Sequence, residues 1–328
     1  MIRVPDRVAR GIDTALDRTV APGYTRIGSA VRRRLPTWPD DPAPAALAGR
    51  HVLVTGASSG LGIATAEGLA QLGAVVHLVV RDEAKGSRVR DEILARVPQS
   101  SVQASLVVDR CDVSDLEDVR RFCRELEPDR LAGVVHNAGA MPPERTESRQ
   151  GHEQTMALHV LGPVLMTELL LPRLEPGARV VLVTSGGMYS QRLRDDDPQF
   201  LQGDYSGVTA YARSKRAQVE LLPVLAARWP GVVVAATHPG WADTPGVAES
   251  LPRFRRITGP FLRDAEDGAD TTVWLVGTDT DPGSGLLWHD RRPRPTHLMR
   301  STRTGEAERA RLWAWVQDQL ELQLTPDA

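Results

Sequence analysis

The chain has 328 residues, of which 41% are hydrophobic, and a formal net charge of −2. This length accommodates one large α/β domain or two small ones, and the near-neutral charge argues against general binding to nucleic acid. The only cysteines, Cys111 and Cys123, are too few for a disulfide framework or a cysteine-based metal site, so we expect no metal. No uninterrupted apolar run approaches the roughly 18 residues of a membrane span, and no secretory leader is evident, so we expect a cytoplasmic protein.

Residues 1–48 form a basic arm. Eight arginines and three aspartates give residues 1–36 a net charge of +5. Apolar residues recur every four positions and predict a helix with a narrow apolar stripe: Val4, Val8, Ile12, Leu16 and Val20. We interpret the arm as a helix packed on the body of the protein or as a solvated segment. Contact with a membrane surface or a partner is the alternative, which the lack of Trp and Phe in the stripe makes less favoured. Residues 36–44 predict an extended, proline-rich linker.

From residue 49 onward, short apolar runs alternate with helical patterns. The predicted strands cover 52–54, 75–80, 106–108, 134–136, 179–184, 232–237 and 286–287. The predicted helices cover 60–72, 83–96, 115–126, 150–172, 210–229 and 306–324. Continuously apolar strands that alternate with helices indicate a parallel sheet covered on both faces. We therefore predict a doubly wound α/β fold of the Rossmann type, with residues 49–328 as one domain after the arm of residues 1–48.

A glycine-rich turn joins the first predicted strand to the first predicted helix, in the segment HVLVTGASSGLG (51–62). Glycine adopts the backbone angles of such a turn at low cost, and its missing side chain lets the backbone approach a pyrophosphate. The helix N-terminus then supplies free N–H groups for the anion. A plain glycine-rich loop is the alternative. We expect these residues of the turn to contact a dinucleotide: Thr55, Gly56, Ser58, Ser59, Gly60, Leu61 and Gly62.

The end of the second predicted strand indicates which dinucleotide binds. Many dinucleotide folds place an acid there, which binds the adenosine ribose hydroxyls. Here Arg81 follows the strand, and a guanidinium suits a 2′-phosphate. This favours NADP over NAD. The alternatives are a solvated surface arginine, or an NAD site in which Asp82 binds the ribose hydroxyls.

Two later strand ends carry further candidates. Asp112 and Val113 follow the third strand, and Asp112 can accept a hydrogen bond from an adenine amino group. Asn137, Ala138 and Gly139 follow the fourth strand, where small residues let the backbone approach a ribose. Because open α/β sheets bind ligands beyond the carboxyl ends of their strands, we expect both segments to contact the cofactor.

Three residues suggest the chemistry. Tyr211 and Lys215 are four residues apart on a predicted helix and so share a face, and Ser185 follows the fifth strand. A free tyrosine titrates near 10, and an ammonium one helical turn away is expected to lower the pKa of the phenol. The serine hydroxyl could then hold a substrate oxygen while the tyrosine transfers its proton. This set suits the interconversion of a carbonyl and an alcohol.

Together these motifs resemble the short-chain dehydrogenase/reductase family over about residues 48–290. The matching segments are TGASSGLG (55–62), CDV (111–113), NAG (137–139), VLVTS (181–185), YARSK (211–215) and HPG (238–240). The resemblance implies an oxidoreductase with a nicotinamide cofactor and a small-molecule substrate. It also implies that Tyr211 is the catalytic acid/base, that Ser185 orients the carbonyl, and that Lys215 binds the nicotinamide ribose and tunes Tyr211.

The resemblance extends to other positions. Pro239, Gly240 and Thr244 are expected to border the nicotinamide. Helices 150–172 and 210–229 are those that the family uses to form dimers, which implies a homo-oligomer. The family commonly has an asparagine where this chain has His159, and that residue helps to hold a proton-relay water. His159 could hold the water too, which makes it a fourth catalytic candidate, or it could be a packing residue in a weakened enzyme.

Two features bear on the substrate. Met141, Met188, Tyr189 and Trp241 could line an apolar substrate pocket or could equally belong to the core. The acidic run 195–197 lies in an unusually long segment before Tyr211, which we interpret as a solvated surface flap. The function expected is therefore an NADP-dependent oxidoreductase on an apolar carbonyl or alcohol. The main alternative is a dinucleotide-binding sensor or interaction module with little turnover.

Overall fold

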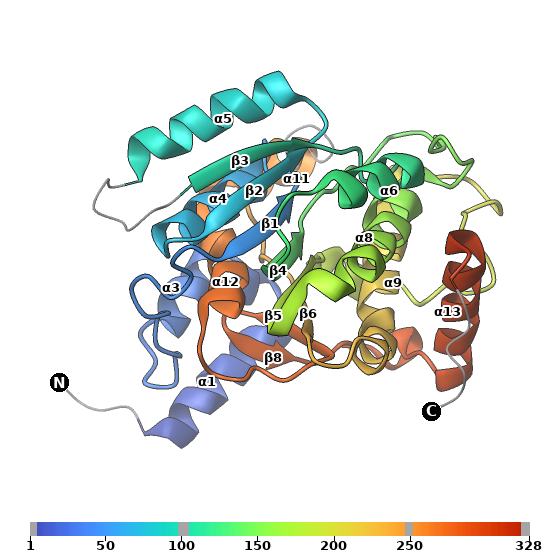
Figure 1. Ribbon diagram of the computed structural model, residues 1–328. Helices are drawn as coiled ribbons and strands as arrows, with labels where there is room; N and C mark the ends of the chain where they lie inside the picture. Colours follow the sequence, from blue (N-terminus) through green and yellow to red (C-terminus); the bar gives the residue numbers. More distant parts are fainter. Residues whose placement is uncertain (1–4, 98–104, 247–251, 323–328) are drawn as a thin grey trace.

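The computed structural model describes residues 5–97, 105–246 and 252–322 (Figure 1). Its centre is an eight-stranded sheet with the order β3-β2-β1-β4-β5-β6-β7-β8, in which only β8 is antiparallel to its neighbour. The strands are β1 His51–Thr55, β2 Val75–Val80, β3 Ser105–Arg110, β4 Leu131–His136, β5 Leu174–Val183, β6 Val233–Thr237, β7 Leu286–His289 and β8 Arg292–Arg294. The strand order reverses between β1 and β4, as in a doubly wound fold, so the predicted fold class is confirmed.

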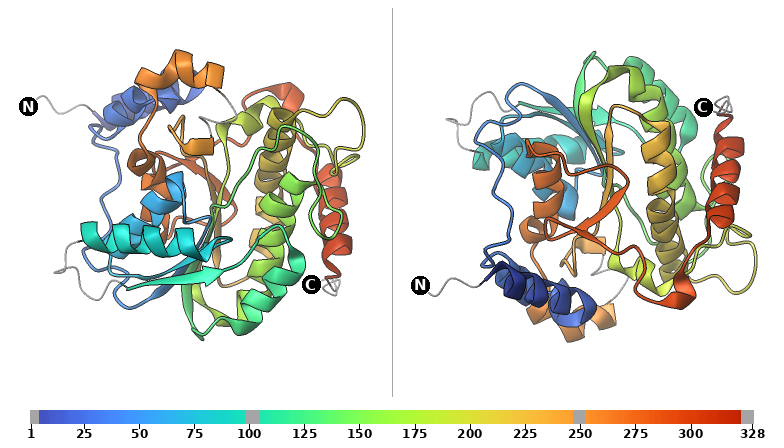
Figure 2. Two further views of the ribbon diagram at one scale, coloured as in Figure 1. Left: turned by 90° about the horizontal axis from the view of Figure 1, so that it is seen from above. Right: turned by 90° about the horizontal axis from the view of Figure 1, so that it is seen from below.

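Helices cover both faces of the sheet, as the two views in Figure 2 show. One face carries α4 Gly60–Gln71, α5 Glu83–Arg96 and α12 Ala265–Gly277, and the other carries α6 Leu116–Glu125, α8 Gly162–Leu170 and α9 Gly207–Arg228. The C-terminal helix α13 Glu306–Leu320 packs outside α9. The other helices are α1 Asp6–Arg18, α2 Ala21–Tyr24, α3 Arg26–Arg32, α7 Gln154–Met156 and α11 Pro252–Thr258. Helices α2, α3, α11 and α12 were not predicted from the sequence.

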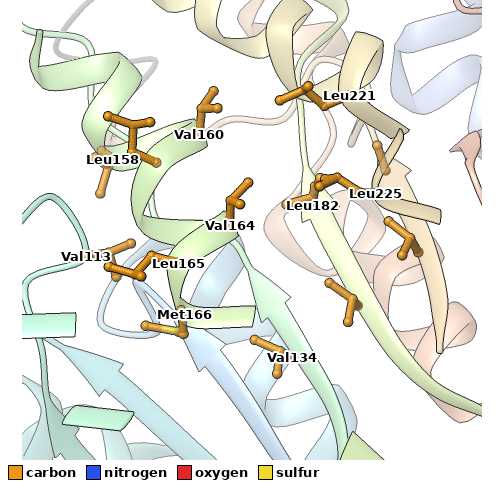
Figure 3. Close-up of a cluster of buried hydrophobic side chains, with 14 of the residues drawn as sticks. Val113, Val134, Leu158, Val160, Val164, Leu165, Met166, Leu182, Leu221 and Leu225 are labelled. Carbon is orange, nitrogen blue, oxygen red and sulfur yellow. The ribbon is translucent and has the colours of Figure 1, made fainter. Parts of the chain in front are cut away.

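Two apolar layers hold the sheet between the helices. In the layer on the α8 side, side chains of α8 and α9 meet those of β4 and β5, as Figure 3 shows for Val164, Leu225, Val134 and Leu182. Each of these residues is at most 3% exposed. Most residues of the inner strands β1, β2, β4 and β6 are buried, which explains their continuously apolar pattern.

The predicted helix 150–172 contains a change of winding. Between α7 and α8 the chain forms one π-helical segment, Ala157–Leu161, and π segments inside helices often occur at functional sites. By length and composition Gln154–Arg173 could cross a membrane, but 78% of the relevant window is buried inside this protein. It is therefore a core helix here.

The basic arm docks in an orientation that the sequence did not predict. On α1, Val8 is 51% exposed and Ile12 is 36% exposed, whereas Asp13 and Asp17 are buried. The helix therefore packs on the body, which was one of the two interpretations, but through its acidic side and not through Val8 and Ile12; Val4 lies outside the described residues. The reason is electrostatic. Buried arginines on α3 and β8 attract the aspartates, so the acidic side of α1 faces inward.

The segment before Tyr211 also differs from the predicted solvated flap. Asp197 is only 4% exposed and accepts hydrogen bonds from the N–H groups of Leu201 and Gln202. The Asp195 side chain is 6% exposed and pairs with Arg311 of α13. Only Asp196 of the acidic run is solvated. The prediction failed for two reasons: Asp195 pairs with a residue far along the chain, and Asp197 caps a turn within its own segment.

Candidate active site

The turns after β1 and β4 are joined where the strand order reverses. The Thr55 hydroxyl accepts hydrogen bonds from the N–H groups of Asn137 and Ala138, each at 3.0 Å. The Asn137 amide in turn donates to the Thr55 carbonyl at 3.0 Å. These bonds fix two strand ends against each other at the crevice where doubly wound folds bind their ligands. Gly139 lies beside them and is exposed.

The glycine turn leaves room for an anion at the start of α4. The N-cap residue Ser59 makes no side-chain hydrogen bond to the helix, whereas Asp82 caps α5 and Asp115 caps α6. The first N–H groups of α4 therefore have no capping side chain. Gly56 and Gly60 have φ of +66° and +50°, a region that favours glycine. This cradle fits the pyrophosphate of a dinucleotide.

Close packing explains the third glycine of the turn. A Cβ on Gly62 would lie 2.3 Å from the Gly56 carbonyl oxygen and 2.7 Å from the Asn137 amide nitrogen. No side chain fits there. Of the other turn residues expected to contact the cofactor, Ser58 and Leu61 are half-buried and Ser59 is exposed.

The predicted adenosine end has Arg81 exposed at the end of β2. One oxygen of the neighbouring Asp82 accepts from the Lys85 N–H at 2.9 Å, as a helix cap. The carboxylate of Asp112 is also engaged, since its Oδ1 accepts from the N–H and the hydroxyl of Ser114. Val113 is buried against Gly162 and contributes backbone rather than a side chain. Capping by Asp82 leaves Arg81 as the better candidate to determine cofactor preference.

The segment after β6 closes over the glycine turn. The side chain of Thr244 lies 3.3 Å from where a Cβ on Gly60 would be. Gly240 has φ of +75°, and a Cβ there would lie 2.6 Å from the Arg263 side chain and 2.7 Å from the Tyr24 carbonyl. Together with Pro239, these are the residues that the resemblance places at the nicotinamide.

Ser185, Tyr211 and Lys215 converge at the carboxyl end of β5. Ser185 follows the strand, and its hydroxyl accepts from the Gly187 N–H at 3.2 Å. Tyr211 and Lys215 lie on α9, with the ammonium 5.6 Å from the centre of the phenol ring. The Lys215 ammonium donates to the Val183 carbonyl at 2.8 Å. The sequence motif thus forms one cluster in space.

Burial dominates the pKa shifts in this cluster. Burial raises the pKa of Tyr211, and a hydrogen bond with Ser185 opposes this only in part. Burial also lowers the pKa of the Lys215 ammonium to about 7. Desolvation is thus the dominant influence on the phenol, and the expectation that Lys215 lowers the pKa of Tyr211 stays a prediction. The phenol is protonated at neutral pH and can act as an acid.

His159 lies in the π segment, fully buried beside Tyr211. Its Nδ1 lies 2.8 Å from the Ser214 hydroxyl, and its Nε2 accepts from the Ala140 N–H at 3.3 Å. The Ser214 hydroxyl donates onward to the Tyr211 carbonyl, so Nδ1 carries the proton that it shares with Ser214. Burial and the nearby Lys215 hold the pKa of His159 well below its usual range. Both nitrogens have protein partners, an arrangement that favours a packing role over holding a relay water.

Of the four residues considered for a substrate pocket, two belong to the core. Met188 is fully buried, and Tyr189 is 6% exposed and donates its hydroxyl proton to the Pro295 carbonyl at 2.7 Å. Met141 and Trp241 are half-buried and stay candidates for lining a substrate pocket. Sequence reasoning missed Tyr24 of the arm, whose ring lies against the backbone at Gly186. Nothing in the sequence pattern of the arm signalled this contact.

A cavity of about 580 Å³ lies away from this cluster, between α3, α4 and α12. Arginines and acids that largely pair with each other line it, among them Arg33, Asp267 and Asp270. It contains none of the predicted catalytic residues.

Comparison with known proteins agrees with this geometry. The family model for short chain dehydrogenases matches residues 50–195, and the chain belongs to the short-chain dehydrogenase/reductase family of oxidoreductases. It is 37% identical to dehydrogenase/reductase SDR family member 12 of Bos taurus over 270 residues, which cover 80% of this chain and 84% of the relative. It is 34% identical to retinol dehydrogenase 12 of Bos taurus, over 81% of this chain and 85% of the relative.

A solved structure shares the fold and holds a cofactor. The complex of Pseudomonas aeruginosa RhlG with NADP superposes with a TM-score of 0.60 and 25% sequence identity, and covers 75% of this chain and 96% of that one. Together with the cradle at α4, this supports a nicotinamide dinucleotide as the cofactor. The individual catalytic and cofactor-binding residues, and homo-oligomer formation, stay predictions.

Proposed function

We propose that the protein is an NADP-dependent oxidoreductase that interconverts a carbonyl and an alcohol on an apolar small molecule. The observation that carries this proposal is the convergence of Ser185, Tyr211 and Lys215 at the end of β5, beside the glycine cradle of α4. When bound, the nicotinamide supplies or accepts the hydride. The preference for the 2′-phosphate is assigned to Arg81.

Each residue of the cluster has a separate task. The Ser185 hydroxyl donates a hydrogen bond to the substrate oxygen and orients it. Tyr211 transfers its phenolic proton to that oxygen in reduction and takes a proton from the alcohol in oxidation. Lys215, buried and anchored on the Val183 carbonyl, supplies a proton donor close to Tyr211. A protonated phenol can serve as the acid when a carbonyl is reduced, and burial favours that form.

The substrate is proposed to be apolar. Met141 and Trp241 are the half-buried apolar side chains that remain from the predicted pocket. One relative is a retinol dehydrogenase, which by its name acts on a long apolar alcohol. We therefore expect a hydrophobic aldehyde or ketone to be a better substrate than a small hydrophilic one.

Nucleotide titration tests the cofactor assignment. The purified protein is titrated with NADPH and with NADH, and binding is followed by nucleotide fluorescence. We expect NADPH to bind about tenfold tighter, and Arg81→Ala to remove this preference, since the guanidinium would no longer pair with the phosphate. Arg88→Ala, an exposed arginine on α5, is the matched control.

A turnover assay tests the chemistry. The protein is mixed with NADPH and all-trans-retinal, and with NADPH and a panel of aromatic ketones, and the loss of NADPH is followed. In the titration described above, equal or tighter binding of NADH than of NADPH would contradict the role of Arg81. Binding of NADPH without turnover of any carbonyl would favour a dinucleotide sensor over an enzyme.

A further inference from the structure

The hairpin between β7 and β8 has a turn that needs an explanation. Its two loop residues, Asp290 and Arg291, both have positive φ, of 51° and 53°. Tight hairpins of this kind usually carry Asn, Asp or Gly followed by Gly, so Arg291 is the unusual residue here. Residues held in such a conformation are often kept for a purpose. The turn opens the segment DRRPR (290–294), to which no role in the chemistry has been assigned.

The charged residues of DRRPR all bind the N-terminal arm. Asp290 pairs with Arg32 of α3 at 2.6 Å. Arg294 forms two hydrogen bonds of 2.8 Å with the carboxylate of Asp13 on α1. Arg291 pairs with Asp41 of the linker at 2.7 Å, and Arg292 donates to the carbonyl of Thr37. The hairpin therefore binds the arm at several points between α1 and the linker, and we call it the socket of the arm.

The centre of this socket is a buried ionic cluster. Arg32 also donates to the carboxylate of Asp13, another residue of the arm, at 2.8 Å. Arg263 forms two hydrogen bonds with the Asp290 carboxylate, at 2.6 and 3.0 Å. Arg32 is 2% exposed, Arg263 1% and Asp290 3%. Buried charges are costly unless they are paired, so losing one partner would leave the others strongly destabilised. We therefore expect the loss of a contact between the arm and the hairpin to be costly.

The socket presents one arm residue to the candidate active site. The Tyr24 carbonyl accepts from the Trp241 N–H at 2.8 Å and from the Arg263 side chain at 3.0 Å. The Tyr24 ring is 1% exposed and packs edge-on against His238, with centroids 4.5 Å apart. A Cβ on Gly186, the residue after Ser185, would lie 3.2 Å from this ring. Tyr24 therefore contacts two segments. One is Gly186, next to the proposed catalytic residue Ser185, and the other is the loop from His238 to Trp241 at the expected nicotinamide end.

We propose that the N-terminal arm forms a fixed part of the substrate side of the active site. The DRRPR hairpin holds the arm there through its ion pairs, an attachment we call the lock. Tyr24 is the positioning residue for the loop from His238 to Trp241. The arm is then part of the catalytic domain and not an appendage at its boundary. The statement that this loop borders the nicotinamide rests on the proposed function. The attachment of the arm to the DRRPR hairpin does not rest on the proposed function.

Hydrogen exchange tests the lock without any ligand. In Asp13→Asn the carboxylate charge that holds Arg32 and Arg294 is lost at nearly constant shape. We expect exchange of the amides in 238–243, including the Trp241 N–H, to accelerate by about tenfold or more as the local opening free energy falls. Glu168→Gln is the control: it removes the charge of a less deeply buried ion pair, with Arg228 on the other side of the sheet, and should leave these amides unchanged. Unchanged exchange in Asp13→Asn would overturn the proposal.

Cleavage of the linker gives a second, direct measurement. A specific protease site is inserted between the exposed residues Ala43 and Pro44, and the folded protein is cut. We expect the severed arm to co-elute with the body in gel filtration, and to dissociate when the same cut is made in Asp13→Asn. Dissociation of the arm from the otherwise wild-type protein would refute the lock.

Two nucleotides test the positioning role of Tyr24. Adenosine 2′,5′-bisphosphate shares the phosphorylated adenosine end of NADPH but lacks the nicotinamide. We expect Tyr24→Ala to weaken NADPH binding by about tenfold and leave the bisphosphate unaffected, with Tyr24→Phe restoring the wild-type affinity. Equal effects of Tyr24→Ala on both nucleotides, or none, would contradict the positioning role. If the wild-type protein bound neither nucleotide, the proposed function would fail, and the exchange experiment would still decide the lock.

Discussion

The imidazole of His159 meets the phenol of Tyr211 edge to face, with ring centroids 5.4 Å apart and planes at 90°. With both ring nitrogens bonded to protein, we expect His159 to act as a packing residue that holds Tyr211 in position. His159→Phe keeps the ring and removes the hydrogen bonds. It should lower the free energy of unfolding by about 1–3 kcal/mol, because the Ala140 N–H and Ser214 lose a partner.

Turnover of His159→Phe separates the two interpretations of this residue. A packing role predicts that kcat falls by less than about tenfold, whereas loss of a proton relay predicts a fall of about a hundredfold or more. Denaturant unfolding and steady-state kinetics on the same preparation give both quantities. A hundredfold loss of kcat in a stably folded variant would restore His159 as a catalytic residue.

Tyr211→Phe removes the proposed proton donor and leaves the ring. We expect kcat for a carbonyl substrate to fall by about 10²- to 10⁴-fold, with NADPH affinity changed less than about threefold. The measurement combines NADPH consumption with the fluorescence titration. Tyr205→Phe is the control, since that phenol binds Glu153 and lies outside the cluster. Retained turnover in Tyr211→Phe would remove this residue from the mechanism.

Gly62→Ala tests the glycine turn. The added methyl would lie 2.3 Å from the Gly56 carbonyl oxygen, so the turn must shift and the phosphate cradle with it. We expect NADPH affinity to fall by about a hundredfold. Gly11→Ala on α1 has no neighbour within 4 Å of the new Cβ and should be neutral, or more stable by about 0.5–1 kcal/mol. Normal NADPH binding in Gly62→Ala would show that the cradle lies elsewhere.

Buried neutral histidines predict acid sensitivity. Burial lowers the pKa of His136 to about 3, and its partner is the Thr167 hydroxyl at 2.8 Å. In the unfolded chain the pKa returns to about 6.5. As the pH falls below 6.5, the unfolded state therefore gains a proton that the folded state does not bind. The free energy of unfolding should decrease by about 1.4 kcal/mol per pH unit from this residue until the pH approaches 3.

Chemical denaturation at pH 7.5, 6 and 5 measures this slope. His136→Asn should reduce the slope below pH 6.5 by about one proton and leave the slope above pH 7 unchanged. An identical pH dependence in both proteins would show that His136 becomes protonated in the folded state.

Helix α13 bears on the predicted homo-oligomer. It buries Leu312, Val316 and Leu320 and packs against α9, one of the two helices that the family resemblance assigns to the dimer interface. Because α13 covers this face, we expect α9 to be unavailable for the homo-oligomer that the resemblance predicts, and the protein to be a monomer with a mass near 35.8 kDa in light scattering. Val316→Asp should loosen α13 and produce dimers or larger species. A dimeric wild-type protein would contradict this expectation and support the homo-oligomer that the family resemblance predicts.

The glycine turn and the alternating strands were predictable because their signals are local. The run 51–62 encodes a buried strand, a turn that requires glycine and a helix start within a few residues, and the structure places β1 and α4 there. Tyr211 and Lys215 were predictable as a pair because four residues span one turn of a helix. Their meeting with Ser185 followed from the rule that parallel strands present their carboxyl ends at the same edge.

The orientation of the arm was decided only by the tertiary structure. A periodic pattern shows which face of α1 is apolar, but it does not show which face is buried. Asp13 turns inward because Arg294, 281 residues away, and Arg32 offer it charge-assisted hydrogen bonds in a site closed to water. The direction of the pKa shift of Tyr211 has the same origin, since desolvation depends on everything packed around the phenol and not on the lysine four residues away. Local sequence determines which helices and turns form, whereas burial and long-range pairing determine which of their faces and charges are used.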